Sequence, residues 1–173
     1  MTKRPIVLLV ALAVTGCADH SIDPVPTPNP DACQQASGGY ECAGIDLLGH
    51  LGIPALAGGT GARLNDIWGW TDPSTGSEYA LVGRSDGTAF VDVTDPEAPR
   101  LVGSLPLTAG ASPSSWRDLK VYADHVFIVA DGAGPHGMQV FDLRRLRDVT
   151  GDPETFDADF LYEEIGSAHN IVV

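Results

Sequence analysis

Lysine is almost absent from this 173-residue sequence. It occurs only twice, and all basic residues together number 10, against 23 aspartates and glutamates. The formal net charge is −13. Proteins that bind nucleic acids or anionic membrane surfaces through charge carry a basic patch or stripe. No such cluster occurs here, so the sequence argues against both kinds of electrostatic partner.

Familiar catalytic motifs are missing as well. The chain contains no nucleophile elbow, phosphate loop, HExxH sequence or EF-hand loop. The order of the residues does not single out a Ser, His and Asp set as a catalytic triad. We therefore predict no cofactor, although a divalent cation could bind at the polar positions described below.

Turn-forming residues are abundant where helix-forming patterns are lacking. The 20 glycines and 13 prolines make up about a fifth of the chain. This composition favours short strands joined by many turns. The length is sufficient for one domain with a sizeable core.

The N-terminus has the features of a bacterial lipoprotein leader. Two basic residues precede an apolar run at 6–14, which is too short to span a bilayer and typical of a secretory signal peptide. The sequence VTGC that follows resembles a lipobox, in which Cys17 would be lipidated. An ordinary signal peptide that happens to contain a cysteine is the alternative. We expect a signal peptide at 1–16, and Ala18 after the cysteine favours the outer membrane by similarity to proteobacterial sorting.

A tether and a cysteine pair follow the leader. Residues 17–32 contain four prolines within seven positions, which impose an extended, polyproline-like chain. The next segment, 33–63, begins with Cys33 and Cys42. Once Cys17 carries lipid, an even number of cysteines remains. In an exported protein this favours a disulfide between the two over a metal-bound pair.

The remaining sequence contains a repeat of about 52 residues. The stretches LNDIWGW, WRDLKVY and AHNIVV align on three polar residues spaced 52 apart, Asp66, Asp118 and Asn170. The residues before them are also polar: Asn65, Arg117 and His169. Further along each repeat, YALVG corresponds to VFIVA, and GTAFVDV corresponds to GMQVFDL.

Each repeat is predicted to form four short strands. In the first repeat they are expected at 66–70, 79–83, 88–93 and 100–105, separated by turn signals rich in Asp, Pro and Gly. Four strands per period of about 50 residues are typical of a β-propeller blade. A β-sandwich, the alternative all-β fold, does not predict this period.

We therefore predict an all-β partial propeller. Blade 1 is expected at 64–115 and blade 2 at 116–167, with the start of a truncated third blade at 168–173. Seven apolar residues should pack within and between the two sheets: Leu81, Phe90, Val91, Ile128, Val129, Val140 and Phe141.

Several motifs together resemble one protein family. After the paired cysteines, NDIWGW, EYALVG, GTAFVDV, WRDLKVY, HGMQVFDL and AHNIVV are similar to the N-terminal part of the bacterial choice-of-anchor B proteins. These are surface proteins built from LVIVD-type propeller repeats, and VFIVAD at 126–131 is the local form of that repeat. The resemblance covers 33–173 and implies a propeller at the cell envelope. The family's later blades are absent from the sequence.

The first strand of a propeller blade lines the central channel. The aligned positions would then form a ring of six polar side chains: Asn65, Asp66, Arg117, Asp118, His169 and Asn170. Such a ring could bind a divalent cation or a small polar ligand. The same groups could instead cap strands or bond to neighbouring blades, and we favour this structural interpretation.

Other polar residues also receive a structural interpretation. His136 lies in a Gly-rich hairpin that could carry function, but we expect it to be part of a turn. Asp92 and Asp142 end the third strand of each repeat and are expected to be structural, with Asp92 or Asp95 bonding local backbone amides in an Asp-Pro turn. Residues 142–148 should form a solvated turn or short helix with local ion pairs.

The three tryptophans lie at the starts of the repeats. They are Trp68, Trp70 and Trp116. We expect them to pack between blades rather than to form a platform for sugars.

Three functions fit the sequence. We favour a lipid-anchored cell-surface protein whose propeller scaffold binds a protein or small-molecule ligand. An exported metal-assisted enzyme, with its site at the mouth of the channel, is the alternative, and a purely structural envelope protein is a third. The fold class alone does not choose among them.

Replacing the lipidated residue tests the anchor. The substitution Cys17→Ser should move the protein out of the membrane fraction, because no thiol is then available for the lipid. Cell fractionation with immunoblotting measures the change, and Ser21→Ala serves as a neighbouring control that keeps the thiol. Unchanged membrane association of the Cys17→Ser variant would refute the lipoprotein interpretation.

Overall fold

The computed structural model describes residues 47–173. The predicted signal peptide, the tether, Cys17 and the Cys33–Cys42 disulfide lie outside these residues. No helix in the described part is long and apolar enough to cross a membrane.

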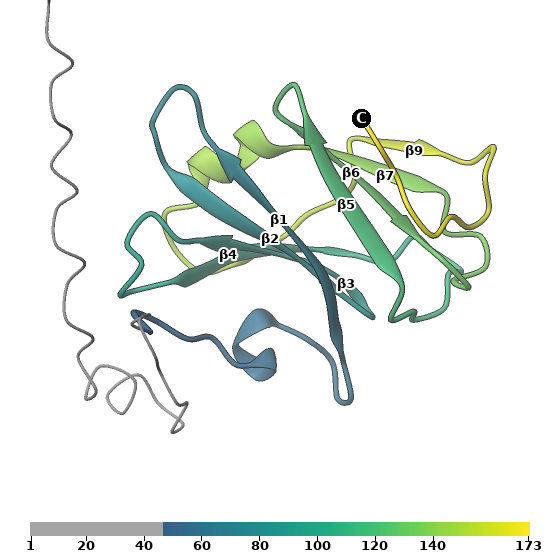
Figure 1. The fold of residues 1–173 in the computed structure, drawn as a ribbon, viewed down its shortest axis with the longest axis horizontal. Helices are drawn as coiled ribbons and strands as arrows, with labels where there is room; N and C mark the ends of the chain where they lie inside the picture. The colour runs from purple at the N-terminus through teal and green to yellow at the C-terminus, as the bar shows by residue number, and fades with distance from the viewer. Residues whose placement is uncertain (1–46) are drawn as a thin grey trace, which may run out of the picture.

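The described chain is all-β, as predicted, and forms two sheets (Figure 1). The first sheet has the order β1 (Leu64–Thr71), β2 (Glu78–Arg84), β3 (Gly87–Asp92), β4 (Arg100–Pro106) and β8 (Glu154–Thr155). The second has the order β5 (Arg117–Tyr122), β6 (His125–Ala130), β7 (Met138–Asp142) and β9 (Phe160–Tyr162). Two short 3₁₀ helices complete the described elements, η1 (Ile53–Leu56) and η2 (Leu143–Asp148).

The first four strands of the first sheet coincide with the four that the sequence predicts. They form an antiparallel meander, in which Leu81 of β2 lies opposite Phe90 of β3. β-branched and aromatic residues in these strands fit a pleated, buried surface, and Asp, Pro and Gly supply the turns. The local sequence pattern is therefore sufficient to locate short strands that follow one another in the chain.

The strand order departs from the prediction in the second repeat. β8 does not join its own repeat but pairs in parallel with β4, with Gly103 opposite Glu154. The next residue, Phe156, donates its N–H to the carbonyl of Ser104 at 2.8 Å. The first sheet thus has five strands, and β9 becomes the fourth strand of the second sheet. Since β8 lies between β7 and β9 in the sequence, its pairing with β4 links the second repeat to the first sheet through ladder hydrogen bonds.

The predicted strand at 171–173 is also not formed in the structure. These residues lack a ladder partner within the described chain, although one of their backbone N–H groups makes a contact described below.

An aromatic cluster forms the centre of the interface between the sheets. The rings of Phe90 and Phe141 are stacked with centroids 4.8 Å apart, and Phe156 lies 5.0 Å from Phe141. Six of the seven predicted core residues are buried. The exception, Val140, is half-buried, because neighbouring residues of a strand point to opposite faces and Phe141 occupies the inward position.

The N-terminal part of the described chain covers the other face of the first sheet. Leu56 of η1 packs in a separate apolar cluster with Val82, Ala89 and Val91. Arg84 holds this segment in place, since its guanidinium donates to the carbonyl of Leu56. Segment 47–63 therefore caps a sheet face that would otherwise be exposed.

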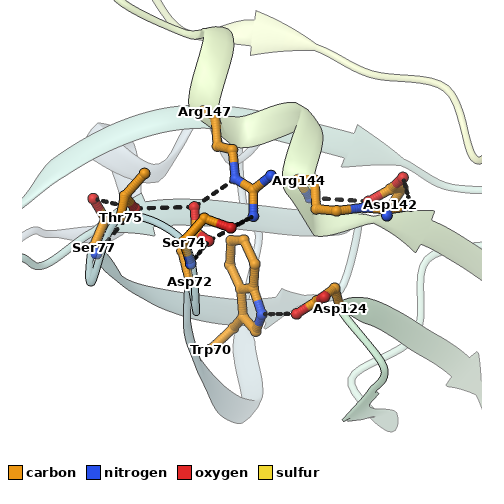
Figure 2. Close-up of polar contacts among 9 residues, drawn as sticks. All are labelled: Trp70, Asp72, Ser74, Thr75, Ser77, Asp124, Asp142, Arg144 and Arg147. Atoms are coloured by element: carbon orange, nitrogen blue, oxygen red, sulfur yellow. Dashed lines mark hydrogen bonds and ion pairs between the residues drawn. The ribbon is translucent and has the colours of Figure 1, made fainter.

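A buried carboxylate joins the two sheets at the end of β1 (Figure 2). Asp72 is fully buried and accepts hydrogen bonds from Nε and Nη2 of Arg147, both at 2.6 Å. The N–H of Ser74 and the hydroxyl of Thr75 donate to the same carboxylate. These bonds hold the pKa of Asp72 well below its usual range, the Arg147 hydrogen bond being the largest cause.

A tryptophan strengthens the same junction. The indole of Trp70 stacks on Tyr79 with centroids 5.4 Å apart, and its Nε1–H donates to Asp124 at 3.1 Å (Figure 2). Trp70 is therefore the tryptophan that packs between the sheets, as predicted. Trp68 and Trp116 are 40% and 60% exposed, yet each ring contacts the following repeat, Trp68 through Lys120 and Trp116 through His169.

The segment at 142–148 differs in part from its prediction. It forms η2, whose N-terminus is capped by Asp142, and Arg144 pairs locally with that same aspartate. Asp92 accepts from the N–H of Thr94 and Asp95 from that of Glu97, which confirms the predicted local backbone bonds after the third strand. However, two leucines of η2 are buried and Arg147 reaches the first repeat, so the segment is an interface element rather than a solvated turn.

Removing the Arg147 guanidinium should lower the stability of the fold. In Arg147→Gln the buried carboxylate of Asp72 loses its charged partner. The ion pair contributes fully above the unfolded pKa of about 3.9 and less as pH falls toward the depressed folded pKa. The wild type should therefore lose stability more steeply than the variant as pH drops below about 4.

Urea unfolding at several pH values measures this difference. Arg100→Gln is the matched control, because Arg100 forms an exposed, longer pair with Asp92 at 3.5 Å. Equal pH dependence in Arg147→Gln and the wild type would contradict the assigned role.

Candidate functional site

Side chains from β1 bond to the backbone of β5 where these two strands lie side by side (Figure 1). The Asp66 carboxylate accepts the N–H of Leu119 at 2.9 Å, and Asn65 Nδ2 donates to the carbonyl of Arg117 at 2.8 Å. β5 is an edge strand, so one row of its backbone groups has no partner within its own sheet. The side chains of β1 supply the missing partners.

The same contact occurs again one repeat later. The Asp118 carboxylate accepts the N–H of Ile171 at 2.7 Å. Both aspartates thus bond a backbone amide 53 residues further along the chain. Ile171 stands in the same relation to Asp118 as Leu119 does to Asp66, although no strand forms at Ile171.

Lys120 lies between the two carboxylates. Its Nζ is 2.5 Å from Asp118 and 3.6 Å from Asp66, and it lies 4.4 Å from the ring centroid of Trp68. Partial burial raises the pKa of Asp118, but hydrogen bonds from Lys120 and Ile171 outweigh it and hold the pKa below its usual range. Sequence reasoning missed Lys120, although its being one of only two lysines was a usable signal.

The aligned polar residues meet around one open cavity of about 270 Å³, here called the first-strand cavity. Its lining consists of Asn65, Asp66, Trp116, Arg117, Asp118, His169 and Asn170. The structure therefore brings together all six residues that the repeat alignment selected. Trp116 is an addition to that set.

Arg117 borders the first-strand cavity, but its side chain is turned into the protein. It is 1% exposed, and its Nε donates to the carbonyl of Arg84 at 2.9 Å. Its Nη1 lies 2.9 Å from Nε2 of His136. Burial lowers the pKa of Arg117 to about 10. The guanidinium is thus a structural group, not part of an open polar ring.

His136 has a larger role than the predicted turn. Its side chain is fully buried, and its Nδ1 lies 3.0 Å from the carbonyl of Gly137. Since Arg117 can only donate, Nε2 of His136 accepts and Nδ1 carries the hydrogen. Burial, the largest cause, lowers the pKa of His136. Neutral His136 therefore serves as an acceptor for a buried cation.

His169 at the rim of the first-strand cavity is oriented by two neighbours. Its Nδ1 lies 3.0 Å from the Asp131 carboxylate, and its ring centroid lies 5.4 Å from that of Trp116. The hydrogen bond from His169 is the largest cause that lowers the pKa of Asp131. Nε2 is the nitrogen of His169 that is left for a ligand.

The described residues do not contain a group of three His, Cys, Asp or Glu side chains that could hold a metal ion. No family model, no curated protein and no solved structure matches the chain.

Removing the Asp66 carboxylate should weaken the contact between β1 and β5. In Asp66→Ala the N–H of Leu119, which is fully buried, loses its acceptor at a cost of about 1–3 kcal/mol. Asp66→Asn keeps an acceptor oxygen and should lose less. The free energy of unfolding, measured with urea, distinguishes the variants.

Asp152→Ala, at an exposed position, provides the control and should change stability by no more than about 0.5 kcal/mol. A loss in Asp66→Ala no larger than in this control would show that the carboxylate does not support the two strands.

Proposed function

We propose that this chain forms part of a lipid-anchored bacterial surface protein in which a β-propeller scaffold presents the first-strand cavity to a small polar ligand. The observation that carries the proposal is the convergence of the aligned polar positions on one cavity, from which only the side chain of Arg117 is turned into the protein. Asp66 and Asp118 also bond the backbone of the following repeat, so their positions at the cavity serve the fold as well as the proposed ligand.

The arrangement of the sheets supports two propeller blades. The innermost strands of the two blades would be β1 and β5, which lie adjacent and are joined by the Asp66 carboxylate contact, and the same contact recurs from Asp118 of β5 to Ile171. Blades pack face to face around an axis and bury their apolar faces against neighbours. A β-sandwich would also bury two sheets, but it gives no reason for the same contact to recur after one period.

The location of the motifs supports membership of the choice-of-anchor B family. NDIWGW lies in β1, EYALVG in β2, GTAFVDV in β3 and WRDLKVY largely in β5. These four motifs therefore coincide with strands of the two sheets, whereas AHNIVV lies at the cavity without forming a strand. In this proposal the lipid on Cys17 and the Pro-rich tether hold the scaffold at the envelope.

A ligand screen tests the binding function. The full chain is screened by thermal shift against small polar molecules, because a ligand at 100 times its Kd stabilises the folded state by about 2.7 kcal/mol. The double substitution His169→Ala and Asn170→Ala removes two cavity side chains and should abolish the shift. Replacement of the exposed Glu163 and Glu164 by alanine should leave it unchanged. A shift that survives the first double variant would refute this site.

A metal-assisted exported enzyme is the second candidate. The Asp131–His169 pair favours it, because metal-binding histidines commonly donate their second nitrogen to a carboxylate. Stoichiometric metal in the purified full chain, found by elemental analysis and lost in His169→Ala, would favour this candidate over the binding module.

A further inference from the structure

Trp116 is the most exposed aromatic group at the first-strand cavity, and its backbone is firmly held. The residue is 60% exposed. Its N–H donates to the hydroxyl of Ser114 at 3.1 Å, and its carbonyl accepts from the N–H of Asp131 at 2.7 Å. A large apolar ring is therefore kept mostly at the surface by a fixed backbone, beside the His169 ring, whose centroid lies 5.4 Å from its own.

The remaining lining offers neutral hydrogen-bonding groups. Asn65 uses its amide nitrogen for the carbonyl of Arg117, which leaves its amide oxygen for another partner. His169, whose Nδ1 is used by Asp131, and Asn170 also line the cavity. Together these groups provide donors and acceptors beside one aromatic face.

The charges at the cavity argue against an ionic ligand. Lys120 contacts both Asp66 and Asp118, and each carboxylate also accepts a backbone N–H, so one of the two negative charges is compensated and both groups already have partners. A cationic ligand would compete with Lys120. An anionic ligand would approach two carboxylates, which is unfavourable.

We propose that the first-strand cavity binds a saccharide, with one sugar ring stacked on the indole of Trp116. This inference rests on the proposed binding function and names its ligand class. A pyranose has a C–H face that suits the negative face of an aromatic ring, and hydroxyls that both donate and accept hydrogen bonds. The cavity volume of about 270 Å³ lies just below the range of about 300–1,000 Å³ for drug-sized ligands. It therefore fits a single sugar ring.

The experiment uses the full chain and a panel of methyl glycosides of hexoses and N-acetylhexosamines. Saturation-transfer NMR identifies a binder, and titration gives its Kd. Trp116→Ala should weaken binding about tenfold or more, while Trp116→Phe should retain part of the affinity because it keeps an aromatic face. Tyr122→Ala is the matched control, since Tyr122, the last residue of the strand that follows Trp116, is 65% exposed but lies outside the cavity lining.

Longer sugars identify the source of the ligand. A β-linked hexamer that binds much more tightly than its methyl glycoside indicates recognition within a polysaccharide, and equal affinity indicates a free sugar or a chain end. Both results support the proposal. It is overturned if no glycoside binds at millimolar concentration, or if Trp116→Ala binds as well as Tyr122→Ala. A non-saccharide ligand that depends on His169 and Asn170 would overturn this inference while leaving the proposed binding function intact.

Discussion

The hydrogen bond from an aspartate carboxylate to the backbone of the next repeat is the contact on which the arrangement of the cavity depends. β1 and β5 are sheet edges, and edge N–H groups that become buried must find an acceptor. Asp66 supplies it to Leu119, and Asp118 supplies it to Ile171. Each bond also fixes the position of the polar residue that precedes the aspartate in the sequence, so these residues lie at corresponding places in the two repeats. The cavity therefore arises from the way in which the backbone groups find their partners.

This solution brings two carboxylates close together, and their repulsion requires compensation. Lys120 provides it by contacting both, with its ammonium group over the ring of Trp68. Like charges at short range would otherwise raise one of the two pKa values. In a chain with a net charge of −13 and two lysines, the position of Lys120 is therefore a structural requirement.

The sequence predicted the features that depend on local pattern. Strands β1 to β4 and the equivalence of Asp66 and Asp118 followed from alternation, turn residues and a fixed spacing. It did not predict the pairing of β8 with β4, because two residues carry no periodic signal. It also missed the bond between Arg147 and Asp72, 75 residues apart, and the inward turn of Arg117. Those outcomes depend on which sheets meet, and this is decided by tertiary packing.

The kind of contact between the two sheets differs along the length of β1, from directional bonds at its ends to apolar packing at its centre. This combination fixes the position of one sheet relative to the other. Stacked phenylalanines fill the centre, but aromatic packing alone tolerates small displacements. Beyond the last residue of β1, the bidentate Arg147–Asp72 pair permits one geometry. Near the first residue of β1, the guanidinium of Arg117 is held by hydrogen bonds to Arg84 and His136. With directional bonds at both ends, the edges of β1 and β5 meet in a single register, and Trp116 is displayed beside them.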